Sequence, residues 1–203
     1  MRTLVAVPMK AYADAKTRLA CAMSPEERRT LAKALFEYGQ SFFSTNYPEF
    51  DRLVVSPSPT VATAAVWSGA SCVYESASRG LNAAATTATQ WAIDRGYERL
   101  LIVPGDIGVW RQEEVDCLLE LSKELDVVVA RAHDGGTNAL VLRLPCEMQF
   151  GYGPQSAARH MAIARQLGKT AVERSLPFLG LDLDTPGDCA TLRNLRHSLG
   201  VAL

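Results

Sequence analysis

The chain has 203 residues, 48% of them hydrophobic and 21% charged, which is the balance of one folded domain and not of a disordered chain. The 21 Lys and Arg residues and the 22 Asp and Glu residues nearly cancel, which argues against a nucleic-acid or membrane-surface partner. No apolar run approaches the roughly 18 residues of a membrane span, and no signal peptide is visible, so we expect a cytoplasmic protein. The five scattered cysteines include no C-x-x-C pair, which predicts free thiols and no structural zinc site.

Strand-like and helical segments alternate along the chain. A short apolar run at 4–7 predicts the first strand, and Ser24-Pro25-Glu26-Glu27 predicts a helix start with a serine cap. Further strands are expected at 53–55, 72–74, 100–103, 127–130, 139–144 and 178–183, and helices at 60–67, 81–95, 112–125, 155–167 and after Thr185. This alternation predicts an α/β fold with three layers, in which helices cover both faces of a mostly parallel sheet. The three tryptophans, Trp67, Trp91 and Trp110, are interpreted as packing residues.

Polar and glycine-rich residues gather where the predicted strands begin or end. They follow the first strand, follow Val103, precede Ala139 and follow Leu181. Ligands of such sheets bind at the carboxyl ends of the strands, so we expect one site to draw on all four segments. The sequence has neither a G-x-x-x-x-G-K-[ST] loop nor a G-x-G-x-x-G turn after the first strand. This disfavours P-loop NTPases and dinucleotide-dependent dehydrogenases.

The loop after the first strand is basic. Residues 1–33 contain seven Lys or Arg and three Asp or Glu, although the whole chain carries a net charge of −1. Cations at the carboxyl edge of a sheet suit a polyphosphate, with lysine as a point charge and arginine as a fork. A solvated basic loop explains the same charges equally well.

Three aspartates are candidates for a divalent cation. Asp106 directly follows a strand, and Asp182 and Asp184 lie two residues apart at the end of the predicted strand 178–183, so they point to one side. Such carboxylates repel each other unless a cation or water separates them, and Mg²⁺ prefers one or two carboxylates with phosphates and water. The alternatives are a turn capped by Asp106 and an exposed strand end at which Asp184 helps to start the next helix.

Two glycine-containing segments could hold an anion. Gly136-Thr137-Asn138 precedes a strand, and Gly153-Pro154-Gln155-Ser156 opens a helix, where free N–H groups favour negative charge. Simple turns remain the alternative for both segments. The histidines show no metal-ligand spacing and no partner nucleophile, so a surface or hydrogen-bonded core position is expected for His160.

Taken in order, these segments resemble one family, the guanylyltransferases that make the precursor of the deazaflavin coenzyme F-420. Members act on 2-phospho-L-lactate, phosphoenolpyruvate or 3-phospho-D-glycerate. The resemblance runs through nearly the whole chain and rests on 8–10, 15–19, 80–84, 104–106, 136–140, 152–160 and 181–186.

The resemblance implies a single nucleotidyltransferase domain over residues 1–203, with a Rossmann-like fold of the nucleotide-diphospho-sugar transferase type. It implies Mg²⁺ as cofactor and GTP and a small phosphorylated acid as substrates. The implied protein partners are a second copy of the chain, in a homodimer, or the downstream transferase that takes up the product. No nucleic-acid partner is implied. The implied catalytic residues are Lys16, Arg18 and Asp106, and the implied metal ligands are Asp106, Asp182 and Asp184. GTP is expected at Pro8, Lys10, Lys16, Gly80, Leu81, Asn82, Pro104 and Asp106, and the acid at Thr137, Asn138, Gly153 and Ser156.

Two departures from the family pattern leave the acceptor open. Gly108-Val109-Trp110 replaces a Pro-Leu-Leu-like stretch, and Tyr152 and Gln155 stand where Phe and Gly are expected. The alternatives are a nucleotidyltransferase for another phosphorylated acceptor, such as a molybdopterin, and a non-catalytic GTP-binding relative.

Overall fold

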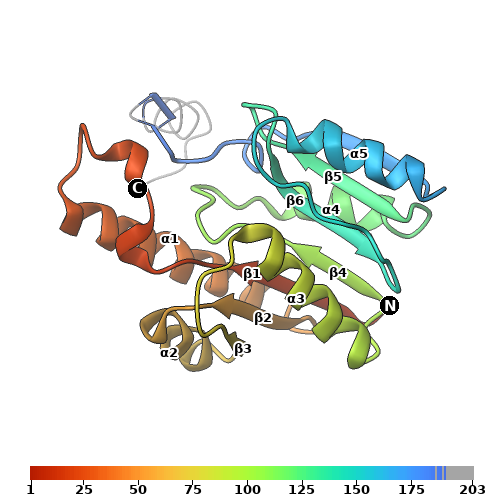
Figure 1. The fold of residues 1–203 in the computed structure, drawn as a ribbon, viewed down its shortest axis with the longest axis horizontal. Coiled ribbons are helices and arrows are strands. Elements are labelled where there is room, and N and C mark those ends of the chain that lie inside the picture. The colour runs from red at the N-terminus through yellow and green to blue at the C-terminus, as the bar shows by residue number, and fades with distance from the viewer. Residues whose placement is uncertain (186, 189, 191–203) are drawn as a thin grey trace.

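A computed structural model describes residues 1–185, 187, 188 and 190, and its centre is a seven-stranded sheet (Figure 1). The strand order is β3-β2-β1-β4-β6-β5-β7. The bounds are β1 Thr3–Pro8, β2 Asp51–Ser56, β3 Ser71–Tyr74, β4 Arg99–Ile102, β5 Val127–Arg131, β6 Thr137–Arg143 and β7 Ala171–Ser175. The predicted mostly parallel sheet is confirmed. Only β6 runs antiparallel to its neighbours β4 and β5, because a short turn joins it directly to β5.

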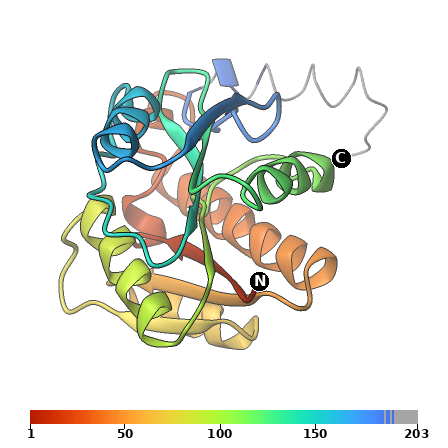
Figure 2. The same ribbon diagram turned by 90° about the vertical axis from the view of Figure 1, so that its right-hand side faces the viewer.

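Helices cover both faces of the sheet, which gives the predicted three layers (Figure 2). Along β1, Val5 and Val7 face one hydrophobic core, and Leu4 and Ala6 face the other. The first core contains residues of α1 (Pro25–Asn46), α2 (Pro59–Trp67) and α4 (Gln112–Leu121), and the second contains residues of α3 (Leu81–Asp94) and α5 (Ser156–Gln166). Two short 3-10 helices, η1 (Tyr12–Asp14) and η2 (Thr17–Leu19), shape the loop after β1.

The predicted start of α1 is confirmed in detail. The Ser24 side chain accepts a hydrogen bond from the Glu27 backbone, and the Glu27 carboxylate accepts one from the Ser24 N–H at 2.7 Å. This reciprocal pair satisfies two N–H groups that the first helical turn leaves without partners. The helix therefore begins at a fixed point, directly after the basic loop.

The prediction of a strand at 178–183 is wrong. Residues 177–180 form a turn, and only Asp182 makes an isolated bridge, to Ile107. The N–H groups of Phe178 and Leu179 donate to the carboxylate of Glu114, at 3.0 and 2.7 Å, so they are not free for a sheet ladder. The last strand among the described residues is instead β7, a half-exposed edge strand with the sequence Ala-Val-Glu-Arg-Ser. Of the helix predicted after Thr185, residues 187, 188 and 190 are helical, and the rest lies outside the described residues.

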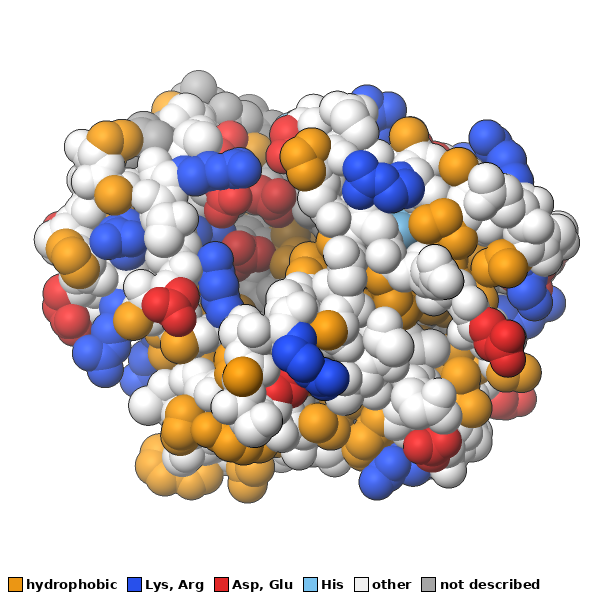
Figure 3. All heavy atoms as spheres, viewed as in Figure 1, with side chains coloured by type: hydrophobic (Ala, Val, Ile, Leu, Met, Phe, Trp, Pro, Cys, Tyr) orange, Lys and Arg blue, Asp and Glu red, His pale blue; other side chains and the backbone are white. Residues whose placement is uncertain are grey.

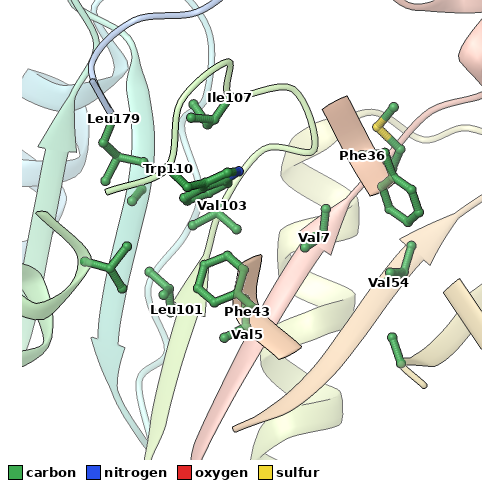
Figure 4. Close-up of a cluster of buried hydrophobic side chains, with 14 of the residues drawn as sticks. Val5, Val7, Phe36, Phe43, Val54, Leu101, Val103, Ile107, Trp110 and Leu179 are labelled. Carbon is green, nitrogen blue, oxygen red and sulfur yellow. The ribbon is translucent and has the colours of Figure 1, made fainter. Parts of the chain in front are cut away.

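Trp110 confirms its predicted packing role. It is 5% exposed and stacks on Phe42 with ring centroids 5.4 Å apart. It also meets Phe43 edge-on at 5.0 Å, and both side chains belong to the buried cluster in Figure 4. The segment 108–110, which departs from the family pattern, therefore anchors in the core the part of the chain that follows Asp106. Trp67, by contrast, is 86% exposed, and its predicted packing role is wrong.

The four cysteines among the described residues are free thiols, as expected, although only Cys146 is buried. Within the same residues, no helix combines the length and the apolar character that crossing a membrane requires.

Candidate active site

One cavity of about 350 Å³ opens along the carboxyl ends of the central strands. The sheet order explains its extent, because neighbouring strands end side by side at this edge. The space-filling view shows a hollow in which acidic side chains lie, bordered by basic ones (Figure 3). The lining comes from the loops after β1, β2, β3 and β4, from the start of α3, from the start of β6 and from Tyr152.

Lys16 joins two of the predicted aspartates. Its ammonium lies 2.7 Å from Asp106 and 3.1 Å from Asp184, and its side chain is fully buried. Burial would lower the pKa of Lys16, but the two carboxylates outweigh it and hold the pKa above its ordinary value. The backbone of Lys16 is left-handed, with φ of 56°, a conformation that costs energy in a residue other than glycine. The loop thus accepts strain to bring this ammonium between the carboxylates.

Asp182 is the third carboxylate of this group. One of its oxygens accepts a hydrogen bond from Nδ2 of Asn138 at 2.6 Å, and the same amide also donates to the backbone of Leu179. Burial and the negative charges of Asp106 and Asp184 raise the pKa of Asp182 to about 7. The predicted aspartates therefore influence each other electrostatically, and Asn138 fixes the position of one of them.

Mg²⁺ matches the chemistry of these side chains, with a limit on how many can bind it. Carboxylate oxygens are its preferred protein ligands, and a cation would relieve the repulsion that raises the Asp182 pKa. Among the described residues, however, no three His, Cys, Asp or Glu side chains are placed to share one ion. The residues thus fit an ion held by one or two carboxylates together with substrate phosphates and water. The assignment of all three aspartates as ligands stays a prediction.

A neutral hydrogen-bond network lies at the β6 end of the cavity. His160 is fully buried; its Nε2 accepts a hydrogen bond from the Gly151 N–H at 3.0 Å, and its Nδ1 lies 3.0 Å from Oγ1 of Thr137. The histidine is uncharged, since burial, reinforced by the positive charge of Arg159, lowers its pKa to about 4. Because Nε2 accepts, Nδ1 carries the proton and donates it to Thr137. His160 is thus a hydrogen-bonded core histidine, as expected.

The Thr137 hydroxyl still has its proton to donate in a hydrogen bond. It accepts from His160 and also from Oγ of Ser156, at 2.9 Å, so both of these neighbours are donors. A hydroxyl has one proton to donate, and neither donor can receive it. Thr137 lines the cavity, so this proton is available to an anion there.

Some of the predicted site residues line the cavity, and the others lie outside its lining. Seven line it: Pro8, Lys10, Gly80, Leu81, Pro104, Asp106 and Thr137. Arg18 is 67% exposed and lies 3.7 Å from Asp184, and Asn82 accepts a hydrogen bond from the Tyr152 N–H at 2.7 Å. Ser156 is buried behind Thr137, and Gly153 is exposed with φ of +126°.

Sequence reasoning missed the far end of the cavity. Val55, Pro57, Glu75 and Ser78 line it, and all four belong to the ends of β2 and β3 or to the loops that follow. Glu75 comes directly after the predicted strand 72–74, just as Asp106 follows the strand 100–103. The rule that pointed to Asp106 therefore also points to Glu75.

The fold is that of a nucleotidyltransferase of the nucleotide-diphospho-sugar transferase type. A nucleotidyl transferase structure from Methanothermobacter thermautotrophicus superimposes with a TM-score of 0.67, at 14% identity, over 98% of this chain and 99% of that one. Within this class, the family described as "Guanylyl transferase CofC like" matches residues 3–195. The chain belongs to that family and is a guanylyltransferase.

Curated relatives support the same assignment over nearly the whole chain. A 3-phospho-D-glycerate guanylyltransferase from Colwellia psychrerythraea is 34% identical, over 95% of this chain and 91% of the relative. A phosphoenolpyruvate guanylyltransferase from Sphaerobacter thermophilus is also 34% identical, over 95% and 93%. A 2-phospho-L-lactate guanylyltransferase from Methanothermobacter thermautotrophicus is 32% identical, over 93% and 82%. The relatives thus agree on the transferred group and differ in the acceptor.

Proposed function

We propose that this enzyme transfers GMP from GTP to the phosphate of a small phosphorylated three-carbon acid and releases pyrophosphate. The observation that carries the proposal is the single cavity lined by Lys10, Asp106 and Thr137. A cation for the triphosphate, a carboxylate for a metal and a hydroxyl donor for a second anion all meet there. Both substrates can therefore approach Asp106 together.

The acceptor we propose first is 3-phospho-D-glycerate. The three acids named for the relatives each carry a phosphate and a carboxylate, and 3-phosphoglycerate adds a hydroxyl. Tyr152 lines the cavity with Thr137, at a position where the family resemblance leads us to expect Phe. Its phenol adds a polar group that can recognise the extra hydroxyl.

The reaction needs no general base. A phosphate monoester carries about −1.5 to −2 charges at neutral pH, so the attacking oxygen is already ionised. That oxygen forms a bond to the α-phosphorus of GTP, and the bond from this phosphorus to the bridging oxygen of the β-phosphate breaks. Pyrophosphate leaves with the electron pair. Positioning and charge neutralisation then provide the catalysis, as in other phosphoryl-type transfers.

Each group of the site has a proposed part in this chemistry. Lys10 neutralises the triphosphate, and Thr137 donates its proton to an anionic oxygen of the acid. Asp106 and Asp182, with Asp184 beside them, would hold Mg²⁺, which supplies charge neutralisation between the two anions. Lys16 acts on the substrates through Asp106 and Asp184, whose positions its buried ammonium fixes.

The test is pyrophosphate release from GTP with Mg²⁺ and a panel of acids, followed by a competition of the three phospho-acids at equal concentration. Mass spectrometry of the products identifies the guanylylated acid. The proposal predicts a product from at least one of the three, with 3-phosphoglycerate preferred. Product only from a molybdopterin-like acceptor, or GTP binding without any product, would replace the proposal with one of the alternatives.

A further inference from the structure

The carboxylate of Glu75 lies at the end of the cavity farthest from Thr137. Its side chain is 5% exposed, and one oxygen, Oε1, accepts a hydrogen bond from Nη2 of Arg79 at 3.1 Å. Among the described residues the other oxygen, Oε2, has no hydrogen-bond partner, and Glu75 lines the cavity. Carboxylates are rarely buried unless they are paired, because burial removes their water. The second oxygen of Glu75 thus remains available to a ligand in the cavity.

The surroundings of Glu75 match a flat, mostly apolar ligand. The apolar Val55 and Pro57 line the cavity from the loop end of the neighbouring strand β2, and Leu81 and Ala84 line it from α3. Lys10, which follows β1, is the one Lys or Arg among the described residues that line the cavity. Arg79, which holds Oε1, is 64% exposed and does not line the cavity. A phosphate or carboxylate of a substrate would be repelled by Glu75. The ligand group beside it must be neutral and must donate hydrogen bonds.

Sheet geometry places the Glu75 carboxylate far from Asp106, where the phosphates of the nucleotide are proposed to bind. Glu75 follows β3 and Asp106 follows β4, and the order β3-β2-β1-β4 separates them by three strand intervals. At about 4.8 Å per interval, the separation is roughly 14 Å. When the phosphates of a nucleotide lie near Asp106 and Lys10, this distance reaches past the ribose to the outer edge of the base.

Of the common bases, guanine suits one carboxylate best. Its outer edge carries two neighbouring donors, N1–H and the N2 amino group, which can face the two carboxylate oxygens. Adenine and cytosine place an acceptor nitrogen beside their amino group, and that nitrogen would repel Glu75. Oε1 can accept a second hydrogen bond while it stays bound to Arg79, because an ionised carboxylate has about four acceptor sites.

We infer that Glu75 selects the base of the nucleotide by accepting hydrogen bonds from N1–H and N2–H of guanine. Arg79 is a positioning residue that holds the carboxylate in place. The inference rests on the proposed use of GTP and extends it, because it names the residue that excludes the other nucleotides.

Nucleotide binding without the acid tests the inference separately from the reaction. Calorimetry with the full-length protein gives the affinity for GTP, for ITP, which lacks the N2 amino group, and for ATP. We expect the wild-type protein to bind GTP roughly 10- to 100-fold more tightly than ITP, and ATP more weakly still. Glu75→Gln keeps the size of the side chain and removes its charge and one acceptor. In this variant the ratio between GTP and ITP should fall to about 1.

Glu124→Gln is the matched control, because Glu124 is exposed and lies outside the cavity. It removes the same charge and should leave all three affinities unchanged. Equal binding of GTP and ITP by the wild-type protein would overturn the inference even if Glu75→Gln failed to fold. An equal loss of affinity for GTP, ITP and ATP in Glu75→Gln would also overturn it. That result would mean that the carboxylate contacts the ribose, which all three nucleotides share. GTP selectivity that depends on Glu75, with no product from any acid, would support the inference and refute the proposed reaction.

Discussion

The two sides of the cavity fix their polar side chains by different means. On the β1 and β4 side, Lys16 joins Asp106 and Asp184 through short ion pairs. On the β6 side, His160 directs the Thr137 hydroxyl through neutral hydrogen bonds. The strength of an ion pair depends on the two charges and little on angle. The direction in which a hydroxyl donates its one proton depends on which of its neighbours are themselves donors. Substitutions that remove a charge should therefore have the largest effects on the β1 and β4 side. On the β6 side, the largest effects should come from substitutions that remove a hydrogen-bond donor.

Replacement of Lys16 should have the largest effect. Lys16→Met leaves the carboxylates of Asp106 and Asp184 together without the buried ammonium that neutralises them. Breaking such a pair by removing one partner costs about 3 kcal/mol of unfolding free energy, and turnover should fall with it. Urea unfolding and pyrophosphate release measure the two effects. Lys16→Arg should restore only part of both, since a planar fork replaces a point charge in a fully buried site.

Arg18→Met is the matched control on the same loop. Arg18 also faces Asp184, but at 3.7 Å and with a side chain that is 67% exposed. Exposed ion pairs contribute less than about 1 kcal/mol, so this variant should unfold nearly as the wild type does. Equal stability losses in the Lys16 and Arg18 variants would refute the distinction between buried and exposed cations.

Asp182→Asn should separate stability from activity on the charged side. The folded-state pKa of Asp182 is raised from 3.8 to about 7, so its contribution to stability is complete below pH 4 and lost as the pH rises through 7. The asparagine cannot ionise and keeps an oxygen for Asn138. The variant should therefore be more stable than the wild type at pH 8 and should match it at pH 4. Its turnover should nearly vanish, because a proposed metal ligand is gone.

Thermal unfolding at both pH values checks this expectation, with circular dichroism to show that the variant is folded. Asp94→Asn is a useful control, because Asp94 is exposed and lies outside the cavity. Near-normal turnover of folded Asp182→Asn would remove Asp182 from the metal site.

His160→Phe should affect the acid and spare the nucleotide. Phenylalanine keeps the aromatic contact with Tyr152, whose ring centroid lies 4.8 Å from that of His160, but cannot donate to Thr137. The Thr137 hydroxyl is then free to turn its proton away from the cavity. We expect KM for the acid to rise roughly 10-fold, the value of one hydrogen bond to a charged group, with KM for GTP unchanged.

A double-mutant cycle tests whether His160 acts through Thr137. In the Thr137→Val background, His160→Phe should change KM for the acid little further. Additive effects would mean that His160 has a separate, structural part. Stability adds a second readout: the lowered pKa of His160 means that its contribution is complete above its ordinary value of 6.5 and is lost as the pH falls towards 4. His160→Phe should abolish this acid sensitivity.

The sheet and the edge at which it binds ligands could be predicted from short-range patterns. Apolar runs such as 4–7 and 100–103 and the serine cap at Ser24 depend on neighbouring residues, and the structure has these elements where they were expected. The error at 178–183 has a long-range cause. The N–H groups of Phe178 and Leu179 donate to Glu114, which is more than 60 residues away in sequence, and no local pattern contains that partner.

The site residues also differ in whether neighbouring or distant residues of the sequence determine their roles. Asp106 and Thr137 could be found because each stands where a strand ends or begins. The contacts that support them could not. Asn138, predicted to bind the acid, instead holds Asp182, and His160 directs Thr137, across 44 and 23 residues of sequence. Burial also decides roles that residue type leaves open. Lys10 and Lys16 have the same side chain on one loop, yet only Lys10 lines the cavity.

The smallest effects are expected from the two departures near the acceptor, Tyr152 and Gln155. Gln155 has a left-handed backbone, with φ of 56°, and its amide donates to the backbone of Asp134 at 3.2 Å. It does not line the cavity, whereas Tyr152 does. The pair therefore offers a direct comparison between a residue that can touch the acid and one that shapes the loop beside it.

Tyr152→Phe should lower the preference for 3-phosphoglycerate over phosphoenolpyruvate by about 5- to 10-fold, the worth of one hydrogen bond to the extra hydroxyl. Gln155→Gly should leave that preference unchanged. Its unfolding free energy should shift by less than about 1 kcal/mol, because glycine relieves the left-handed strain but adds disorder to the unfolded chain. Competition between the two acids, read by product mass, measures the preference in both variants. A changed preference in Gln155→Gly with none in Tyr152→Phe would assign recognition of the acid to the loop of Gln155, and Tyr152 would then serve only to pack against His160.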